Sequence, residues 1–169
     1  MFSISIDYKQ PINLTNCDTT IREYDYDLDS IESLIIDLCE LLSQTKLVNF
    51  NVSGFGLKWQ LDLASDLSSI VSQIPSFIEA LDKSTDSSIQ FYEQGTEREL
   101  FVKCEGDMVV IVCKDLNGNL LTNREESLPK VEVIIMLKQV LKNFLFLSNR
   151  IAPSIVQHKI FINWVRKNH

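Results

Sequence analysis

The chain has 169 residues, 45% of them apolar and 23% charged, which is the composition of a globular domain and not of a disordered chain. Its net charge of −7 argues against binding of nucleic acid by the molecule as a whole, because phosphate neutralisation needs a surplus of cations. The sequence has no long apolar run and no signal-peptide pattern. It therefore predicts one cytoplasmic domain, residues 1–169, with reduced thiols and no membrane contact.

The N-terminal region predicts a strand, an irregular segment and a helix. Residues 2–6 alternate between apolar and polar side chains, as a strand does, and residues 7–27 are polar with a proline at position 11. The helix is expected to begin at Asp29 or Ser30, either of which is a good N-cap. Its apolar stripe at helical spacing consists of Ile31, Leu34, Ile35, Leu38, Leu41 and Leu42.

The next segment predicts a β-hairpin. Residues 48–52 and 57–63 both alternate between apolar and polar side chains. A two-residue II′ turn at Gly54-Phe55 would place Phe50 opposite Trp59, so that one face of the hairpin is apolar and the other polar.

A helix and three strands are expected after the hairpin. The helix covers residues 65–83, with Ser65 or Asp66 as its N-cap and a kink or a new start at Pro75. The strands are expected at 88–94, 97–105 and 108–115.

Two-residue turns at Gly95-Thr96 and Gly106-Asp107 set the register of these strands. This register pairs Glu93 with Arg98 and lines up three residues of the polar face, Tyr92, Glu99 and Lys114. The residues expected on the core face are Ile89, Phe91, Leu100, Val102, Cys104, Val109, Ile111 and Cys113.

The C-terminal region predicts two further helices. Pro129 is expected in the first turn of a largely buried helix, and Pro153 opens the last helix, which ends in basic residues. The resulting order, β-α-ββ-α-βββ-α-α, is typical of an α+β fold with an antiparallel sheet of five to six strands and helices packed on it. The C-terminal helices are expected to cover the second face of the sheet, with a binding surface as the alternative; its apolar residues are Phe101, Met108, Val110 and Val112.

Opposite charges are segregated along the chain. Residues 18–40 carry eight carboxylates and one cation, Arg22, whereas residues 128–169 carry seven Lys and Arg and one carboxylate, Glu132. Strong local fields without a reactive centre are typical of a protein that holds a partner.

No residue pattern predicts catalysis, a cofactor or a metal site. The four cysteines lack CxxC spacing and the chain has two histidines, so neither a zinc site nor a Cys–His pair is expected. The alternating acids of residues 25–29 lack the central glycine and the twelfth-position glutamate of a calcium loop. Glu93, Glu97 and Glu99 could approach one another as a hydrolytic pair, but the register gives Glu93 and Glu99 cationic partners.

Three motifs within residues 47–115 carry a family resemblance. They are the turn Phe91-Tyr92-Glu93-Gln94-Gly95 followed by Arg98, the Gly54-Phe55-Gly56 segment with Trp59, and Asp66-Leu67 opening a helix. In these motifs the chain resembles small acidic immunity proteins of bacterial polymorphic or contact-dependent toxin systems. The resemblance implies a cytosolic, non-enzymatic protein that blocks a cognate toxin by occluding its active site or docking beside it.

Two surfaces are candidates for binding a toxin domain, since carboxylates attract a cationic partner such as a nuclease. The first is acidic and aromatic and contains Tyr24, Asp25, Tyr26, Asp27, Asp29 and Glu32. The second is the tip of the later hairpin, with Tyr92, Glu93, Gln94 and Arg98. A solvated acidic face and a purely structural turn are the competing interpretations of these residues. The alternative functions are a non-enzymatic adaptor or effector-chaperone subunit and, behind it, a carboxylate-dependent hydrolase.

Overall fold

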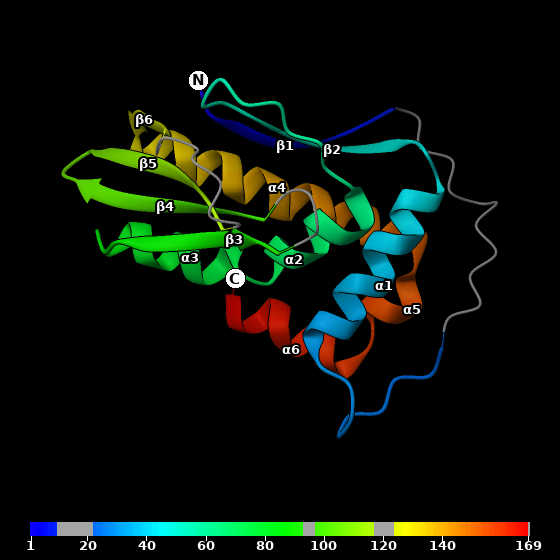
Figure 1. The fold of residues 1–169 in the computed structure, drawn as a ribbon. Helices are drawn as coiled ribbons and strands as arrows, with labels where there is room; N and C mark the ends of the chain where they lie inside the picture. Colours follow the sequence, from blue (N-terminus) through cyan, green and yellow to red (C-terminus); the bar gives the residue numbers. More distant parts are fainter. Residues whose placement is uncertain (10–21, 93–96, 117–123, 169) are drawn as a thin grey trace.

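The computed structural model describes residues 1–9, 22–92, 97–116 and 124–168, and within them six strands form two antiparallel sheets (Figure 1). The smaller sheet pairs β1 (Ser3–Tyr8) with β2 (Val48–Ser53). The larger sheet is a meander in chain order, made of β3 (Ser87–Phe91), β4 (Arg98–Glu105), β5 (Met108–Asp115) and β6 (Arg124–Pro129). The chain is α+β as predicted, but its strands divide into two sheets instead of one.

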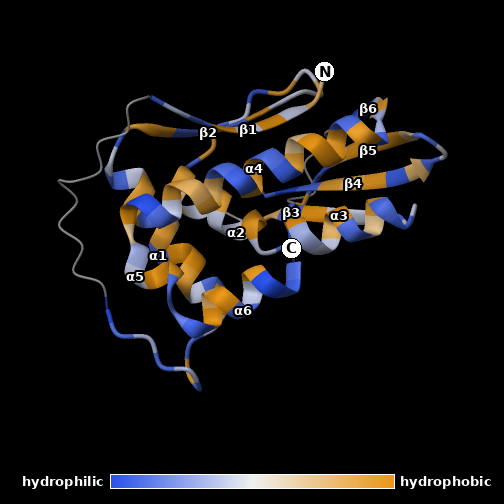
Figure 2. Cartoon of the chain, turned by 180° about the vertical axis from the view of Figure 1, so that it is seen from behind, coloured by the Kyte–Doolittle hydropathy of each residue, from blue (hydrophilic) through white to orange (hydrophobic). Residues whose placement is uncertain are grey.

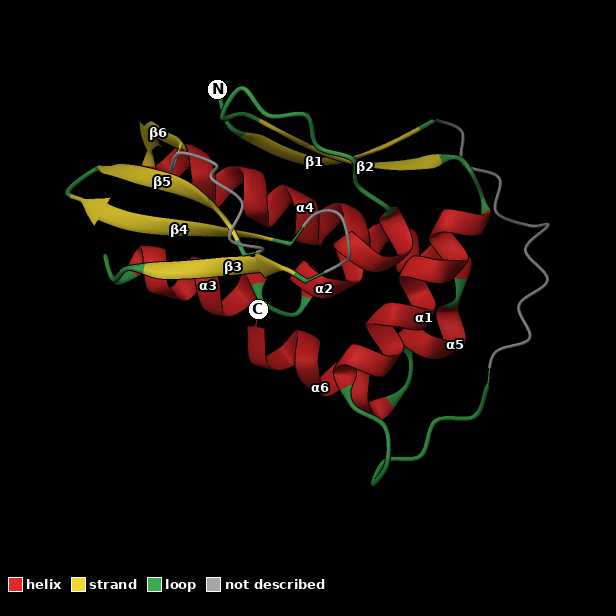
Figure 3. Cartoon of the chain, viewed as in Figure 1, coloured by secondary structure: helices red, strands yellow, loops and turns green. Residues whose placement is uncertain are grey.

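The helices lie behind the larger sheet and at one end of it. Figure 2 shows α3 (Ile74–Asp82) and α4 (Lys130–Ile151) on the same face of that sheet. Figure 3 shows the other helices gathered at its end: α1 (Ile31–Gln44), the π-helical turn η1 (Leu63–Leu67) with α2 (Ser68–Val71), α5 (Pro153–Val156) and α6 (Lys159–Asn168). None of the described helices combines the length and the apolar character that crossing a membrane requires.

The core lies between the larger sheet and the pair α3 and α4. Phe77 of α3 and Val133 of α4 surround one small apolar space together with Leu100 and Ile111 of the sheet. All four side chains are buried, because the apolar positions of each element face the others. The core face predicted for β3, β4 and β5 is therefore confirmed, with Cys104 half-buried at its end.

The second face of the larger sheet is not covered by the C-terminal helices, so this expectation is wrong. The apolar stripe of α4 packs on the face that α3 already covers. On the opposite face Val112 is buried and Phe101 is half-buried, with the Lys114 ammonium 4.3 Å from the centre of the Phe101 ring. Met108 at the end of β5 is 39% exposed. The Lys114 side chain thus covers part of this face by lying on the Phe101 ring.

The hairpin predicted over residues 48–63 does not form, because β2 pairs with β1 and places Phe50 opposite Ile6. Gly54, Phe55 and Gly56 all have positive φ, whereas a II′ turn requires positive φ at its first central residue alone. The chain that follows is extended and alternates between inner and exposed side chains, with no strand partner. Its alternation reflects packing against the core and not pairing within a sheet.

Side chains of β6 hold this turn against the larger sheet. The Arg124 guanidinium donates to the carbonyl oxygens of Phe55 and Gly56 at 2.7 and 2.9 Å, and the Glu126 carboxylate accepts from the amide of Phe55. These contacts satisfy backbone groups of a loop that makes no ladder. The strand β6 was not predicted from the sequence, because Leu128 is its one buried residue and its apolar and polar residues do not alternate.

Several local predictions are confirmed and others are shifted. Ser30 is the N-cap of α1, and Pro75 starts α3. The cap before η1 is Asp62, whose carboxylate accepts from the Ser65 amide, so the predicted caps are wrong. The last predicted helix is divided into α5 and α6. Two apolar residues of α4, Val131 and Ile135, are each 60% exposed, so this helix is less buried than expected.

Candidate partner-binding surface

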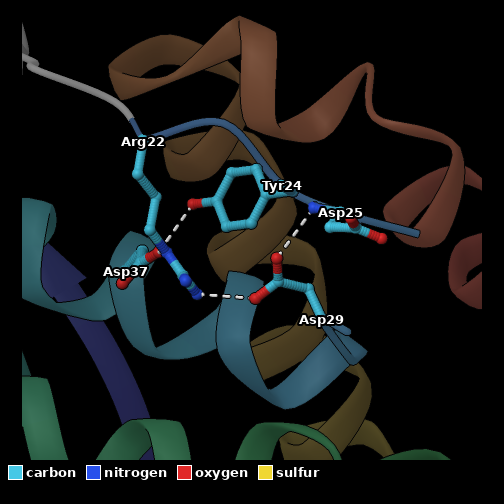
Figure 4. Close-up of polar contacts among 5 residues, drawn as sticks. All are labelled: Arg22, Tyr24, Asp25, Asp29 and Asp37. Carbon is cyan, nitrogen blue, oxygen red and sulfur yellow. Dashed lines mark hydrogen bonds and ion pairs between the residues drawn. The ribbon is translucent and has the colours of Figure 1, made fainter. Parts of the chain in front are cut away.

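The acidic segment predicted as a docking surface is a loop that is tied to α1 by one arginine (Figure 4). The Arg22 guanidinium contacts the Asp29 carboxylate at 2.9 Å and the Asp37 carboxylate at 3.0 Å. Both acids hold the pKa of Arg22 above its ordinary value, with the hydrogen bond to Asp37 as the largest cause. Arg22, the single cation of residues 22–40, is therefore already paired with two carboxylates of the same segment.

Tyr24 serves the structure of this loop more than its outer surface. Its hydroxyl donates to the Asp37 carboxylate at 2.7 Å, and its ring centre lies 5.6 Å from that of His158, just before α6. Burial raises the pKa of Tyr24, and the hydrogen bond to Asp37 raises it further. This candidate residue is half-buried, so it anchors the loop between α1 and the C-terminal helices.

The carboxylates of Asp25 and Asp29 bind the backbone of their own loop. Asp29 accepts from the Asp25 amide at 2.9 Å, and Asp25 accepts from the Asp27 amide at 2.8 Å. Such side-chain turns are a common use of aspartate. Among the described residues there is no group of three His, Cys, Asp or Glu side chains that could hold a metal ion.

The exposed tip of the loop consists of three residues. Tyr26 is 56% exposed and Leu28 is 86% exposed, with the exposed Asp27 between them. The Lys159 ammonium of α6 lies 4.9 Å from the centre of the Tyr26 ring. The two charge blocks of the sequence therefore meet at this point, where a basic residue of the last helix contacts the acidic loop.

A groove lies beside this loop and joins residues from both predicted surfaces. Glu32 of α1 and Tyr92, the residue after β3, line the same hollow of about 390 Å³. Tyr92 is 59% exposed and Ile36, one turn after Glu32, is 44% exposed. Glu32 and Tyr92 were predicted on separate surfaces, and the other described residues of the lining were not predicted: Ile36, Ser68, Ser69, Ser72 and Gln73.

The remaining candidates of the hairpin tip lie apart or outside the described residues. Glu93 and Gln94 are not among the residues that the structure describes. Arg98 pairs with Phe91 across the strands and not with Glu93, so the predicted register of β3 is wrong. Its guanidinium lies 4.5 Å from the centre of the Trp59 ring, so Arg98 packs on the extended segment after the turn.

The predicted pair of Glu99 with Lys114 is confirmed, at 2.9 Å across β4 and β5. Gln90, not Tyr92, is the third member of this row, and its amide donates to Glu99 at 3.1 Å. Burial alone would raise the pKa of Glu99, but the hydrogen bonds from Lys114 and Gln90 outweigh it and hold the pKa below its ordinary value. A hydrolytic general acid needs the opposite shift.

This shift makes the stability contributed by Glu99 depend on pH. Because the folded pKa is lower than the unfolded one, the contribution is present above the ordinary value of 4.5 and is lost as pH falls through the folded pKa. Glu99→Gln is expected to lower the unfolding free energy by about 0.5 kcal/mol at pH 7 and to converge with the wild type in acid. Urea unfolding at several pH values measures this. The exposed Glu125→Gln is the control, and an equal pH profile for both variants would contradict the assignment.

The described cysteines are poor nucleophiles. Burial raises the pKa of Cys39, raises that of Cys113 to about 11, and raises that of Cys104. A thiol with a raised pKa stays protonated at neutral pH, and the thiolate is the reactive form.

Comparison with known proteins adds no relative to this picture. No family model matches the chain, and neither a curated protein nor a solved structure is significantly similar to it. The function is therefore inferred from the candidate partner-binding surface itself.

Proposed function

We propose that this chain is an immunity protein that binds a cognate bacterial toxin without covalent chemistry and neutralises it. The observation that carries the proposal is the unbalanced charge of residues 22–40, which hold seven carboxylates and one cation. That cation, Arg22, is already paired with Asp29 and Asp37. A cationic toxin domain would find a field of the opposite sign here, and such fields speed association and select partners.

The same region offers apolar contact area, which charge alone cannot supply. Tyr26, Ile36 and Tyr92 are all exposed, and tyrosine is enriched among the residues that dominate binding energy. The loop that carries Tyr26 is tied to α1 through Arg22 and Tyr24, so little conformational freedom is lost on binding. The resemblance to acidic immunity proteins supports the same function.

The rival function is an adaptor or effector-chaperone subunit that uses the same surface for a non-toxic partner. The gene next to the one for this chain separates the two. An immunity protein is expected beside a gene for a large protein with a repeat-rich N-terminal part and a variable C-terminal toxin domain.

The direct test is to express that C-terminal domain in bacteria with and without this chain. Growth arrest by the domain alone, rescue by the chain and a stable complex of the purified pair are the expected results. Absence of a complex at micromolar concentrations, or arrest that the chain does not relieve, would contradict the proposal.

A further inference from the structure

The groove between α1, α2 and Tyr92 has three serines in its described lining, and two of them donate their hydroxyl protons to the backbone. The hydroxyls of Ser68 and Ser69 donate to the carbonyl oxygens of Ser65 and Asp66, both at 2.8 Å. Each hydroxyl oxygen therefore retains acceptor sites and no proton to offer.

The amide of Gln73 is committed in the same way. Its nitrogen donates to the carbonyl oxygens of Ser69 at 2.5 Å and Gln90 at 3.0 Å, which uses both of its protons. Its oxygen accepts from the Gln90 amide at 3.1 Å. The side chain thereby occupies the outward backbone groups of Gln90 in the edge strand β3, which hinders a partner strand from pairing at this residue.

Glu32 adds a full negative charge to the acceptors. It is exposed, and it has no ion-pair or hydrogen-bond partner among the residues that the structure describes. Among the described residues that line the groove there is no lysine or arginine. Tyr92 and Ile36 present an aromatic ring and an aliphatic side chain beside it. The hollow thus combines a carboxylate, hydroxyl acceptors, one aromatic face and an apolar wall.

We propose that this groove receives an arginine side chain of the partner protein. The inference rests on the proposed function, since it names the contact by which the partner would be held. A guanidinium has five donors and no acceptor, which complements the acceptors of the lining. Its plane stacks on an aromatic ring while its methylenes contact apolar surface, and a carboxylate can bind it in a bidentate manner. A volume of about 390 Å³ accommodates one such side chain.

The first experiment uses N-acetyl-arginine amide as the probe and N-acetyl-citrulline amide, its neutral analogue, as the reference. Titration followed by amide NMR shifts is expected to show saturable changes with arginine at Glu32, Ile36 and Tyr92, and about tenfold weaker binding of citrulline. Glu32→Gln and Tyr92→Leu are each expected to weaken binding of the arginine probe by about fivefold or more. Asp107→Asn removes the same charge from the exposed turn between β4 and β5 and is expected to leave the affinity for the arginine probe unchanged.

Equal shifts with citrulline, or arginine binding that survives both groove variants, would overturn the proposal. Spermidine is the third probe. If spermidine binds saturably and displaces the arginine probe at a concentration lower than that of the arginine probe, the groove is assigned to a free polycation instead. All three substitutions are at exposed positions, so unchanged melting temperatures confirm that the variants are folded.

The second experiment separates this inference from the proposed function. The affinity of the toxin domain is measured for the wild type, Glu32→Gln and Tyr92→Leu. An at least tenfold loss in the variants supports the groove. Tight binding that both variants retain would overturn the groove while the immunity function stands. Failure of the wild type to bind would contradict the immunity function, and the arginine titration would still decide the groove.

Discussion

The substitution Gly54→Ala is expected to lower the free energy of unfolding by about 3 kcal/mol or more, a large part of the stability of a single domain. Gly54 has φ of +123°, which only glycine adopts without strain. An added Cβ would also lie 2.8 Å from the Cα atom of Phe2 and 3.3 Å from a carboxylate oxygen of Glu126. The first neighbour is backbone, so it cannot rotate away, and the start of β1 must move.

Gly106→Ala is the matched control for this effect. Gly106 also has positive φ, at +66°, but no heavy atom lies within 4 Å of the position of its Cβ. The control is therefore expected to cost about 1 kcal/mol, from backbone strain alone. Guanidinium unfolding of the three proteins, followed by tryptophan fluorescence and circular dichroism, measures the difference. Equal losses for the two variants would show that the approach of Gly54 to Phe2 does not limit stability.

The same turn explains why part of the fold could not be read from the sequence. Apolar alternation in residues 57–63 was correctly recognised, since the apolar side chains do face the core. Alternation, however, indicates which side chains are inside and does not identify the strand that pairs with the segment. The partner of β2 is β1, whose paired residues lie 40 to 50 positions away in the chain, and the turn is held by Arg124 and Glu126. Both are long-range contacts without a local signal.

Some predictions that depended on local physical chemistry were successful, whereas the cap at Ser65 or Asp66 and the II′ turn at Gly54-Phe55 were wrong. The Gly106-Asp107 turn fixes the register of β4 with β5, so that Glu99 meets Lys114 as predicted. The apolar stripe of α1 follows from helical spacing alone, and the helix begins after Ser30, one of the two predicted caps, although the Ser30 side chain makes no capping hydrogen bond. The strand β6 had neither kind of signal, because it is an edge strand with a single buried residue.

The residues of the candidate surface show the same difference between local and long-range signals. The composition of residues 22–40 identified the acidic character of this face, and Asp27 and Tyr26 are exposed as a docking surface requires. Tyr24 and Asp29 turn inward because Tyr24 donates to Asp37 and Asp29 pairs with Arg22. A count of charges in the sequence does not predict these contacts. The groove depends on the approach of α1 to α2 and to the end of β3, which tertiary packing alone determines.

Charge at the loop tip is expected to govern how fast the toxin domain binds. Asp27→Lys reverses an exposed charge, so association at low salt is expected to slow by about tenfold or more, with little change in the dissociation rate. The effect is expected to disappear near 0.5 M salt, because the screening length then falls to a few ångströms. Stopped-flow kinetics over a salt series measures both rates. Dissociation that quickens as much as association slows would show that Asp27 makes a direct, desolvated contact.

Asp107→Lys makes the same change in net charge at the opposite end of the molecule, in the turn between β4 and β5 (Figure 1). Association of this control is expected to slow far less, because the turn lies far from α1 and charges separated by more than the screening length, about 8 Å at physiological salt, interact weakly. Glu32→Gln completes the set, since loss of a charge inside the groove is expected to raise the dissociation rate. If the two lysine variants slow association equally, net charge alone steers the partner, and residues 22–40 have no special part in the encounter.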